Sequence, residues 1–229
     1  MARTSDDTRQ RLLEAARSIF AHHGYEGASV AAIALRARVT KPALYYHFGS
    51  KANLYEALVV ETLDDRWRLM RAAAAQGNSL EERLTGVIEA CFRHAREHRE
   101  GTRICFSALF AAPDEVPRRA SFMRRGRRNF EFVAQLLREG ARRGELRRDL
   151  NVRELAAAIY SRVVANSLAE IIQGSSAPPA NARSAVRIFL QGAAADPRER
   201  GRRRRAAAPT PALCRTPGPA RLAKRPVVF

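Results

Sequence analysis

The stretch TKPALYYHFGSK (residues 40–51) carries the signals of a short helix that starts at a polar cap and stops at glycine. Thr40 suits the N-cap position, and Pro42 in the first turn has no amide to satisfy. We therefore expect the Thr40 hydroxyl to accept a hydrogen bond from the amide of Ala43. Phe48 is predicted to face the core, and the paired tyrosines of this stretch are predicted to lie on the outer face of the helix.

Helical periodicity extends from this stretch in both directions. Upstream, an apolar stripe ends at Gly24, a natural stop, and Ser29 is placed to cap a second short helix in SVAAIALRARV. Downstream, Ser50 is placed to cap a helix from about residue 51 to about residue 75, long enough to connect two domains. The upstream stripe consists of Leu12, Leu13, Ala16, Ile19 and Phe20.

The remainder of the chain is also predicted to be helical. SLEE (residues 79–82) is a capping box, in which the serine oxygen takes an orphan amide and the glutamate reaches back. Asn151 and Asn181 are N-cap signals for two later helices, and the first of these carries a long apolar stripe. Between the SLEE helix and Asn151 lie a segment near residues 103–112 and a helix over about 118–143. No strand alternation or internal repeat appears, so the predicted fold class is all-α.

The charge favours a polyanionic partner. The formal net charge is +18, and the segment 196–229 contributes +8 of it through ten basic and two acidic residues. Both parts of the chain are therefore basic, and nucleic acid is the first candidate. The sequence contains no run of about 18 apolar residues and no apolar signal core at its N-terminus, so we expect a cytoplasmic protein without a membrane partner.

The first three predicted helices suit a helix-turn-helix, in which two short helices cross steeply and the second enters a DNA major groove. Ile33, Ala34, Val39 and Leu44 are spaced as apolar anchors for that packing. The helix that begins at Thr40 is the second of this pair. Its start offers free amides and a partial positive charge to a phosphate, with Lys41 beside it. Tyr45 and Tyr46 add hydroxyls for phosphate and rings for thymine methyls or sugars. Lys51 and Ser29 are placed for flanking phosphates.

These signals predict three parts. Residues 1–50 form a three-helix helix-turn-helix domain, and residues 51–195 form a larger helical domain. Residues 196–229 hold six of the eleven prolines and are predicted to be a disordered basic tail. The run GRRRR in that tail either adds non-specific phosphate affinity or is solvated without a specific role.

Residues 8–58 (TRQRLLEAARSIFAHHGYEGASVAAIALRARVTKPALYYHFGSKANLYEAL) resemble, without a gap, the N-terminal DNA-binding domain of the TetR family of bacterial transcriptional regulators. In that family this domain binds operator DNA as part of a homodimer. A C-terminal helical domain binds a small molecule, which usually releases the DNA. The resemblance implies DNA contacts at Ser29, Thr40, Lys41, Pro42, Tyr45, Tyr46, His47 and Lys51.

The resemblance also implies that the last two helices, over about 152–173 and 182–194, form a four-helix dimer interface. The long apolar stripe on the first of them fits this role. The interface residues that we predict are Leu155, Ile159, Val163, Leu168, Ile171, Val186 and Phe189.

One position departs from the family pattern. Where the family commonly has glycine in the turn between the two helices, this chain has Arg38, in RARVT. A positive φ costs a non-glycine residue about 1 kcal/mol, so the turn is either slightly strained or relaxed to another geometry. Arg38 is also a candidate for a phosphate contact.

Large apolar side chains of the second domain are candidates to line a ligand cavity, although plain core packing explains any single one of them better. They are Trp67, Met70, Phe92, Phe106, Phe110 and Phe130. Phe130 and Phe132 are predicted to point to different sides of their helix, so at most one faces a given cavity. The arginines over residues 118–148 either attract an anionic ligand or form a solvated face.

No catalytic, metal or cofactor site stands out. Three cysteines without paired spacing argue against zinc and disulfides, and Cys91 and Cys105 are predicted to be core residues rather than a redox pair. His22 and His23 lack further ligands and are predicted to be solvated. The sequence thus predicts a ligand-responsive transcriptional repressor released from a palindromic operator by a small-molecule effector. The alternative is a basic DNA-binding protein without sequence specificity.

Overall fold

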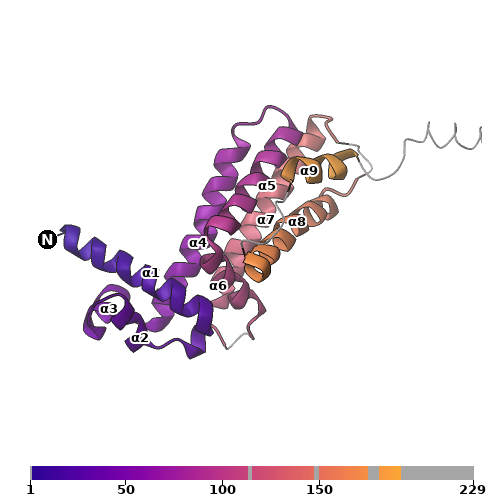
Figure 1. Ribbon diagram of the computed structural model, residues 1–229. Helices are drawn as coiled ribbons and strands as arrows, with labels where there is room; N and C mark the ends of the chain where they lie inside the picture. The colour runs from indigo at the N-terminus through magenta and orange to yellow at the C-terminus, as the bar shows by residue number, and fades with distance from the viewer. Residues whose placement is uncertain (1, 113–114, 147–149, 175–180, 192–229) are drawn as a thin grey trace, which may run out of the picture. The chain divides into compact units, whose positions relative to one another are not determined.

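The computed structural model describes residues 2–112, 115–146, 150–174 and 181–191, and all regular structure in these ranges is α-helical (Figure 1). The predicted all-α class is therefore confirmed. The predicted tail at 196–229 lies outside the described residues. The helices are α1 (Ala2–Gly27), α2 (Val30–Arg36), α3 (Lys41–Phe48), α4 (Lys51–Ala74), α5 (Leu80–Glu97), α6 (Arg99–Phe110), α7 (Arg119–Arg142), α8 (Val152–Gln173) and α9 (Ala182–Gln191).

The predicted caps of α2, α3 and α4 are confirmed. Each is a hydroxyl in an extended residue that accepts from an unpaired amide of the first turn. Ser29 Oγ accepts from the Ala31 amide at 3.2 Å. Thr40 Oγ1 accepts from Ala43 at 3.3 Å, as Pro42 requires, and Ser50 Oγ accepts from Asn53 at 3.1 Å. These caps fix where α3 begins and where α4 leaves it.

Near its end α1 is interrupted at Gly24, whose φ of 69° and ψ of −176° lie outside the helical region. This backbone conformation is open to glycine and costly for other residues. The interruption lets the chain turn toward α2, so Gly24 acts as the predicted stop although regular helix resumes after it. The stripe upstream of Gly24 is buried as predicted, with Leu12 and Ala16 fully inaccessible.

One hydrophobic cluster joins the first four helices to α6. It contains Leu12 and Phe20 of α1, Leu44 of α3 and Leu54 of α4, together with Ile104 of α6. Tyr55 lies at its centre, edge-on to Phe20 with ring centroids 5.0 Å apart. Helix α6 therefore packs directly on α1 and α4, the helices that flank the helix-turn-helix in the chain. The domain boundary near residue 50 stays a prediction, because this core crosses it.

A second cluster fills the bundle formed by α4, α5, α7, α8 and α9. Ser79 caps α5 as predicted, but the Glu82 carboxylate accepts from the Asn78 amide at 2.8 Å rather than from the Ser79 amide. Helix α6 starts at Arg99, earlier than predicted, because the break after α5 at His98 has no glycine or proline to mark it. Asn151 and Asn181 cap α8 and α9 as predicted.

Helix α8 is joined to the α5–α6 corner by a buried carboxylate. The Glu170 side chain is 3% exposed, and Arg96 and Arg99 approach it at 3.3 and 3.4 Å. A buried charge needs such partners, because its desolvation is otherwise uncompensated. The C-terminal half of α8 is thereby tied to the helix pair that also carries part of the first cluster.

Within the described residues, α8 is also the one helix long and apolar enough to cross a membrane by length and composition alone. Its most apolar 18-residue window has a mean hydropathy of 1.3, and 28% of that window is buried inside the chain. A core helix of a soluble protein meets the same criterion, and Glu170 with its two arginines is costly in hydrocarbon. The low burial nonetheless leaves much of α8 uncovered by its own chain.

Candidate DNA interface and ligand pocket

The outer face of α3 presents two tyrosines side by side. Tyr46 is 81% exposed and Tyr45 49% exposed, and neither hydroxyl has a hydrogen-bond partner within the described residues. Phe48 is buried, and the Arg9 guanidinium lies 5.3 Å from its ring centroid. The sequence prediction for these three rings thus agrees with their positions. A pair of free phenols on a capped helix start is suited to phosphate and base-edge contacts.

Two predicted contact residues are less free than expected. Lys51 Nζ donates to the Glu26 carbonyl at 3.2 Å and lies 4.5 Å from the Tyr25 ring centroid, so it joins α4 to the end of α1. His47 is half-buried and packs edge-on against Tyr46 with centroids 5.2 Å apart. Ser29, Lys41 and Pro42 are exposed. The contacts of Lys51 could not be predicted from the sequence, because they depend on where Tyr25 lies in the folded chain.

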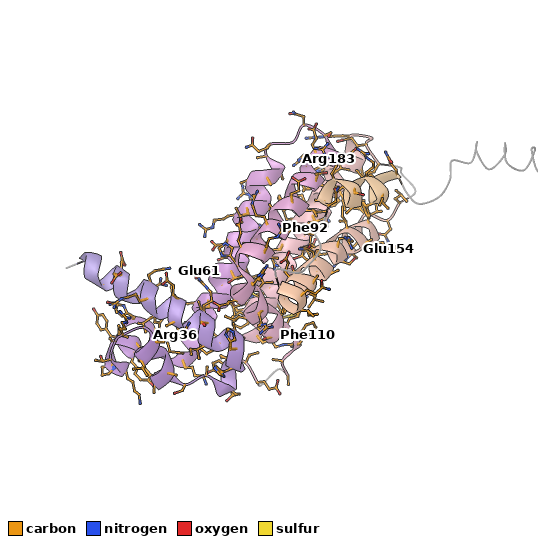
Figure 2. All side chains as sticks on the ribbon, viewed as in Figure 1. Arg36, Glu61, Phe92, Phe110, Glu154 and Arg183 are labelled. Carbon is orange, nitrogen blue, oxygen red and sulfur yellow. The ribbon has the colours of Figure 1, made fainter. Side chains whose placement is uncertain are left out.

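The segment that contains α2 and α3 carries a one-sided charge. Between Glu26 and Glu56 the sequence has no acidic residue and four cations, which are Arg36, Arg38, Lys41 and Lys51. Arg36, Arg38 and Lys41 are exposed and make no ion pair within the described part of the chain. Arg36 is labelled on this end of the molecule in Figure 2. Unneutralised cations around a helix start are the electrostatic footprint of a phosphate-binding surface.

The turn between α2 and α3 uses Arg38 in the left-handed region, with a φ of 56°. The Val39 amide donates to the Ala34 carbonyl and the Arg38 amide to the Leu35 carbonyl, both at 3.0 Å. These two bonds form the Schellman motif, in which glycine usually occupies the left-handed position. The sequence left open a strained turn with a positive φ at Arg38 or a relaxed turn of another geometry. The structure has the strained turn.

Two substitutions at this position separate backbone strain from charge. We expect Arg38→Gly to be more stable to urea than Arg38→Ala by about 1 kcal/mol, because only alanine keeps the cost of a positive φ. Both variants lose the same cation, so both should weaken DNA binding equally and lower its salt slope by about 1. Equal stability of the two variants would contradict the strain, and unchanged salt slopes would contradict the phosphate contact.

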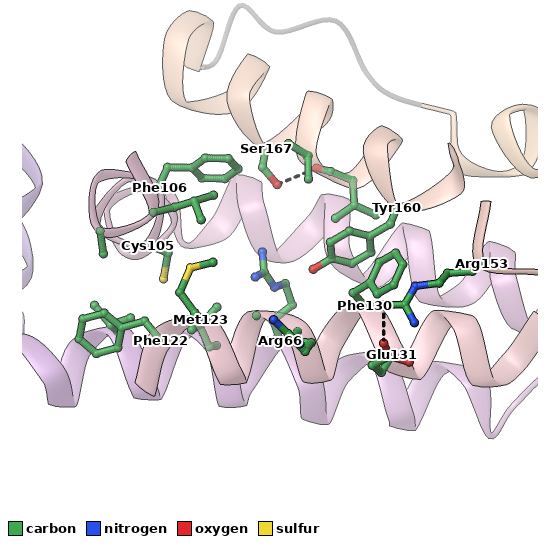
Figure 3. A pocket seen from close by; sticks show the side chains of 18 residues that line it. Arg66, Cys105, Phe106, Phe122, Met123, Phe130, Glu131, Arg153, Tyr160 and Ser167 are labelled. Atoms are coloured by element: carbon green, nitrogen blue, oxygen red, sulfur yellow. Dashed lines mark hydrogen bonds and ion pairs between the residues drawn. The ribbon is translucent and has the colours of Figure 1, made fainter. Parts of the chain in front are cut away.

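A pocket of about 440 Å³ lies between α4, α6, α7 and α8 (Figure 3). Its size falls in the range of about 300–1,000 Å³ that small-molecule sites occupy. Most of its wall is apolar, and burial raises the pKa of the Cys105 thiol in that wall to about 11. The ionisable side chains that line it are Arg66, Arg127, Glu131, Arg153, Tyr160 and Cys105. These groups make it a candidate effector site.

Only Phe106 and Phe130 of the six predicted ligand residues line this pocket. Met70 and Phe92 are corrections, because both are buried in the second cluster away from the cavity. Trp67 is half-buried outside this pocket, with the guanidinium carbons of Arg71 and Arg128 at 4.8 and 4.3 Å from its ring centroid. Phe110 is 71% exposed and contacts the Phe106 ring.

Phe130 and Phe132 point to different sides as predicted, since only the former lines the pocket. Sequence reasoning missed Tyr160, whose ring packs edge-on to Phe130 at 5.8 Å, and Arg66 on α4. A polar residue spaced to face the apolar stripe was the available signal for Arg66. It was hidden among 41 lysines and arginines.

The predicted dimer residues divide into two groups. Ile159, Val163 and Val186 are at most 3% exposed in the core of the single chain, so they cannot face a partner and are corrections. Leu155, Leu168, Ile171 and Phe189 are partly exposed. Helix α8 has a second, uncovered face at spacings of three and four residues, and Ile188 of α9 is 62% exposed. This face consists of Ala158, Ser161, Ala165, Leu168 and Ile172.

A helix-turn-helix with unpaired cations, joined to a helical bundle that holds a pocket, is typical of DNA-binding transcriptional regulators. Family models agree over most of the chain. Residues 12–58 match the bacterial regulatory proteins of the tetR family, and residues 77–193 match the tetracyclin repressor-like C-terminal domain. The chain belongs to the TetR family.

Two curated relatives differ in their effect on transcription, since one is named an activator and the other a repressor. The chain is 34% identical over 111 residues to the HTH-type transcriptional activator FasR of Mycolicibacterium smegmatis, covering 48% of this chain and 51% of that protein. It is 40% identical over 83 residues to the repressor AcnR of Corynebacterium glutamicum, covering 36% and 42%. The matched region thus spans about half of these relatives or less, and it does not decide between activation and repression.

Solved structures share the fold. PfmR of Thermus thermophilus, a TetR family regulator, is 25% identical with a TM-score of 0.67, over 82% of this chain and 98% of that one. FadR of Bacillus subtilis, solved in complex with stearoyl-CoA, has a TM-score of 0.68 at 18% identity, over 80% and 98%. The latter shows likeness of fold alone.

Proposed function

We propose that the chain is a homodimeric, cytoplasmic repressor that binds a palindromic operator and leaves it when a small-molecule effector fills the pocket. One observation carries this proposal. Helix α4 runs unbroken from the cap beside α3 to the pocket wall, where it contributes Val59, Leu63 and Arg66. The DNA-reading surface and the cavity therefore share one helix.

A second path supports coupling between the two sites. Helix α6 lines the pocket with Cys105 and Phe106, and it buries Ile104 against the helices of the N-terminal cluster. The Tyr55 hydroxyl of α4 also donates to the Ile104 carbonyl at 3.4 Å. A ligand that favours one arrangement of α4 and α6 then shifts the orientation of α3, by its difference in affinity for the two arrangements.

The uncovered face of α8, with Ile188 of α9, is our proposed dimer surface. Alanine and serine on this face allow close approach of a partner helix, while Leu168 and Ile172 supply apolar contact. Two recognition helices related by twofold symmetry require half-sites spaced by about one helical turn of DNA, roughly 34–36 Å, or multiples of it. Membrane insertion of α8 is not part of the proposal.

Selection of bound duplexes from a random DNA pool tests specificity. We expect a palindromic consensus that the full chain binds at least about a thousandfold more tightly than its scrambled sequence at about 150 mM salt, as specific regulators do. Equal affinity for the consensus and the scrambled duplex at every salt concentration would instead support the alternative of a non-specific basic protein.

A further inference from the structure

The pocket contains an arginine without an anion. Arg66 projects from α4 into the cavity, and its Nε is buried without a hydrogen-bond partner among the described residues (Figure 3). No ion pair to Arg66 is present in the described part of the chain either. Arg66 as a whole is partly buried. A guanidinium does not lose its proton in proteins, so the buried Nε stays part of a charged group and its desolvation is uncompensated.

Three carboxylates on the helices around the cavity, those of Asp64, Glu131 and Glu170, are already engaged. Asp64 of α4 contacts Arg125 and Arg128 at 3.5 and 2.5 Å. Glu131 of α7, the one carboxylate in the pocket wall, lies 3.7 Å from Arg153.

Glu170 of α8 is held by Arg96 and Arg99, as described above. Rearrangement of one of these side chains toward Arg66 would break an existing pair. Among the described residues, no acidic side chain pairs with this guanidinium.

The groups around Arg66 divide the pocket into an apolar lobe and a polar position. Cys105, Phe106, Phe122 and Met123 lie on one side of Arg66 in Figure 3, and the Tyr160 hydroxyl points toward the guanidinium from the other. That hydroxyl has no hydrogen-bond partner within the described residues. Arg127, which is exposed and unpaired there, adds a second positive charge to the wall.

We propose that the effector is an organic acid with an apolar body, whose carboxylate pairs with Arg66 and accepts from the Tyr160 hydroxyl while its body fills the lobe beside Met123. That this ligand releases DNA rests on the proposed function, but the chemical class of the ligand rests on the cavity alone. A neutral ligand of the same shape would leave the guanidinium unpaired. An apolar body without the acid would therefore bind more weakly.

Calorimetry on the full chain without DNA tests the ligand class, with hexanoate and decanoate against hexanol and decanol as probes. We expect a carboxylate to bind roughly ten- to a hundredfold more tightly than the matched alcohol, the gain of a charge-assisted hydrogen bond. In Arg66→Met this preference is lost and the alcohol binds as before. Arg68→Met, which removes a 71% exposed guanidinium from the same helix, keeps it.

A melting temperature and a second variant allow the inference to be tested even if one variant fails to fold. Arg66→Met should melt no lower than the wild type, because it removes an unpaired charge and keeps the volume. Gly126→Leu should abolish binding of every probe without loss of stability, because a Cβ at Gly126 meets no atom within 4 Å and the new side chain enters the cavity.

Three outcomes overturn the inference. They are equal binding of acid and alcohol, no binding of either acid at millimolar concentration, and tighter binding of decanoyl-coenzyme A that Arg66→Met leaves unchanged. The last outcome points to a thioester conjugate. Release of the selected palindrome is measured separately. A carboxylate that binds through Arg66 but leaves DNA bound upholds the ligand class and refutes effector release.

Discussion

Replacing Lys41 and Tyr45 together with alanine should weaken binding to the selected palindrome by about a hundredfold or more. Base-edge and phosphate contacts of this kind contribute about 1–3 kcal/mol each. The fold should persist, because both side chains are exposed and Thr40 and Pro42, which start the helix, remain. Fluorescence anisotropy on the labelled palindrome at fixed salt measures the loss, and thermal melting checks the fold.

A matched control separates this site from general charge. Arg183→Ala on α9 removes the same unit of charge from an exposed position that Figure 2 places in the helical bundle, away from α3. It should leave affinity for the palindrome nearly unchanged. Comparable losses in the control and the double variant would refute the assignment of α3. Lys51 is left intact because its bond to the Glu26 carbonyl helps to join α1 and α4.

The second large effect is expected from Ala165→Asp, which should produce monomers at micromolar concentration and weaken operator binding by more than about a hundredfold. Ala165 is exposed in the middle of the uncovered face of α8. In a twofold interface the new carboxylate meets its own symmetry mate, and burial of an unpaired charge costs several kcal/mol. A monomer then presents a single half-site reader instead of two linked ones.

Sedimentation velocity gives the oligomeric state, and anisotropy on the same samples gives the DNA affinity. Ala72→Asp is the control, since it makes the same change at an exposed position of α4. A dimeric Ala165→Asp with normal DNA affinity would move the interface to another surface. A monomeric wild type with full affinity would refute the dimer itself.

The parts of the fold that depend on neighbouring residues were predictable from the sequence. The caps at Thr40, Ser50 and Asn151 follow from side-chain chemistry within three or four residues, and the structure confirms them. The left-handed Arg38 was one of the two geometries left open by the family resemblance, and the sequence alone did not decide between them. The Glu82 bond to Asn78 shows the limit of this reasoning, because two adjacent amides compete for one carboxylate.

Assignments that depend on how helices rotate against one another were less successful. Helix α8 has apolar residues on two faces, and the sequence does not show which face meets its own bundle. Ile159 and Val163 were therefore given to the partner although they fill the core. Met70 and Phe92 were misplaced for the same reason. Arg66 lies in register with the buried stripe of α4, but its role as a pocket residue depends on four helices that close around it.

The absence of carboxylates between Glu26 and Glu56 bears on how fast DNA is found. A segment with cations and no anions orients the molecule during diffusion, so that encounters occur with α3 toward the duplex. Association should then be faster than the about 10⁵–10⁷ M⁻¹s⁻¹ of unsteered docking and should slow steeply with added salt. Residence time on the palindrome would depend instead on the tyrosines, so that arrival and departure are set by different side chains.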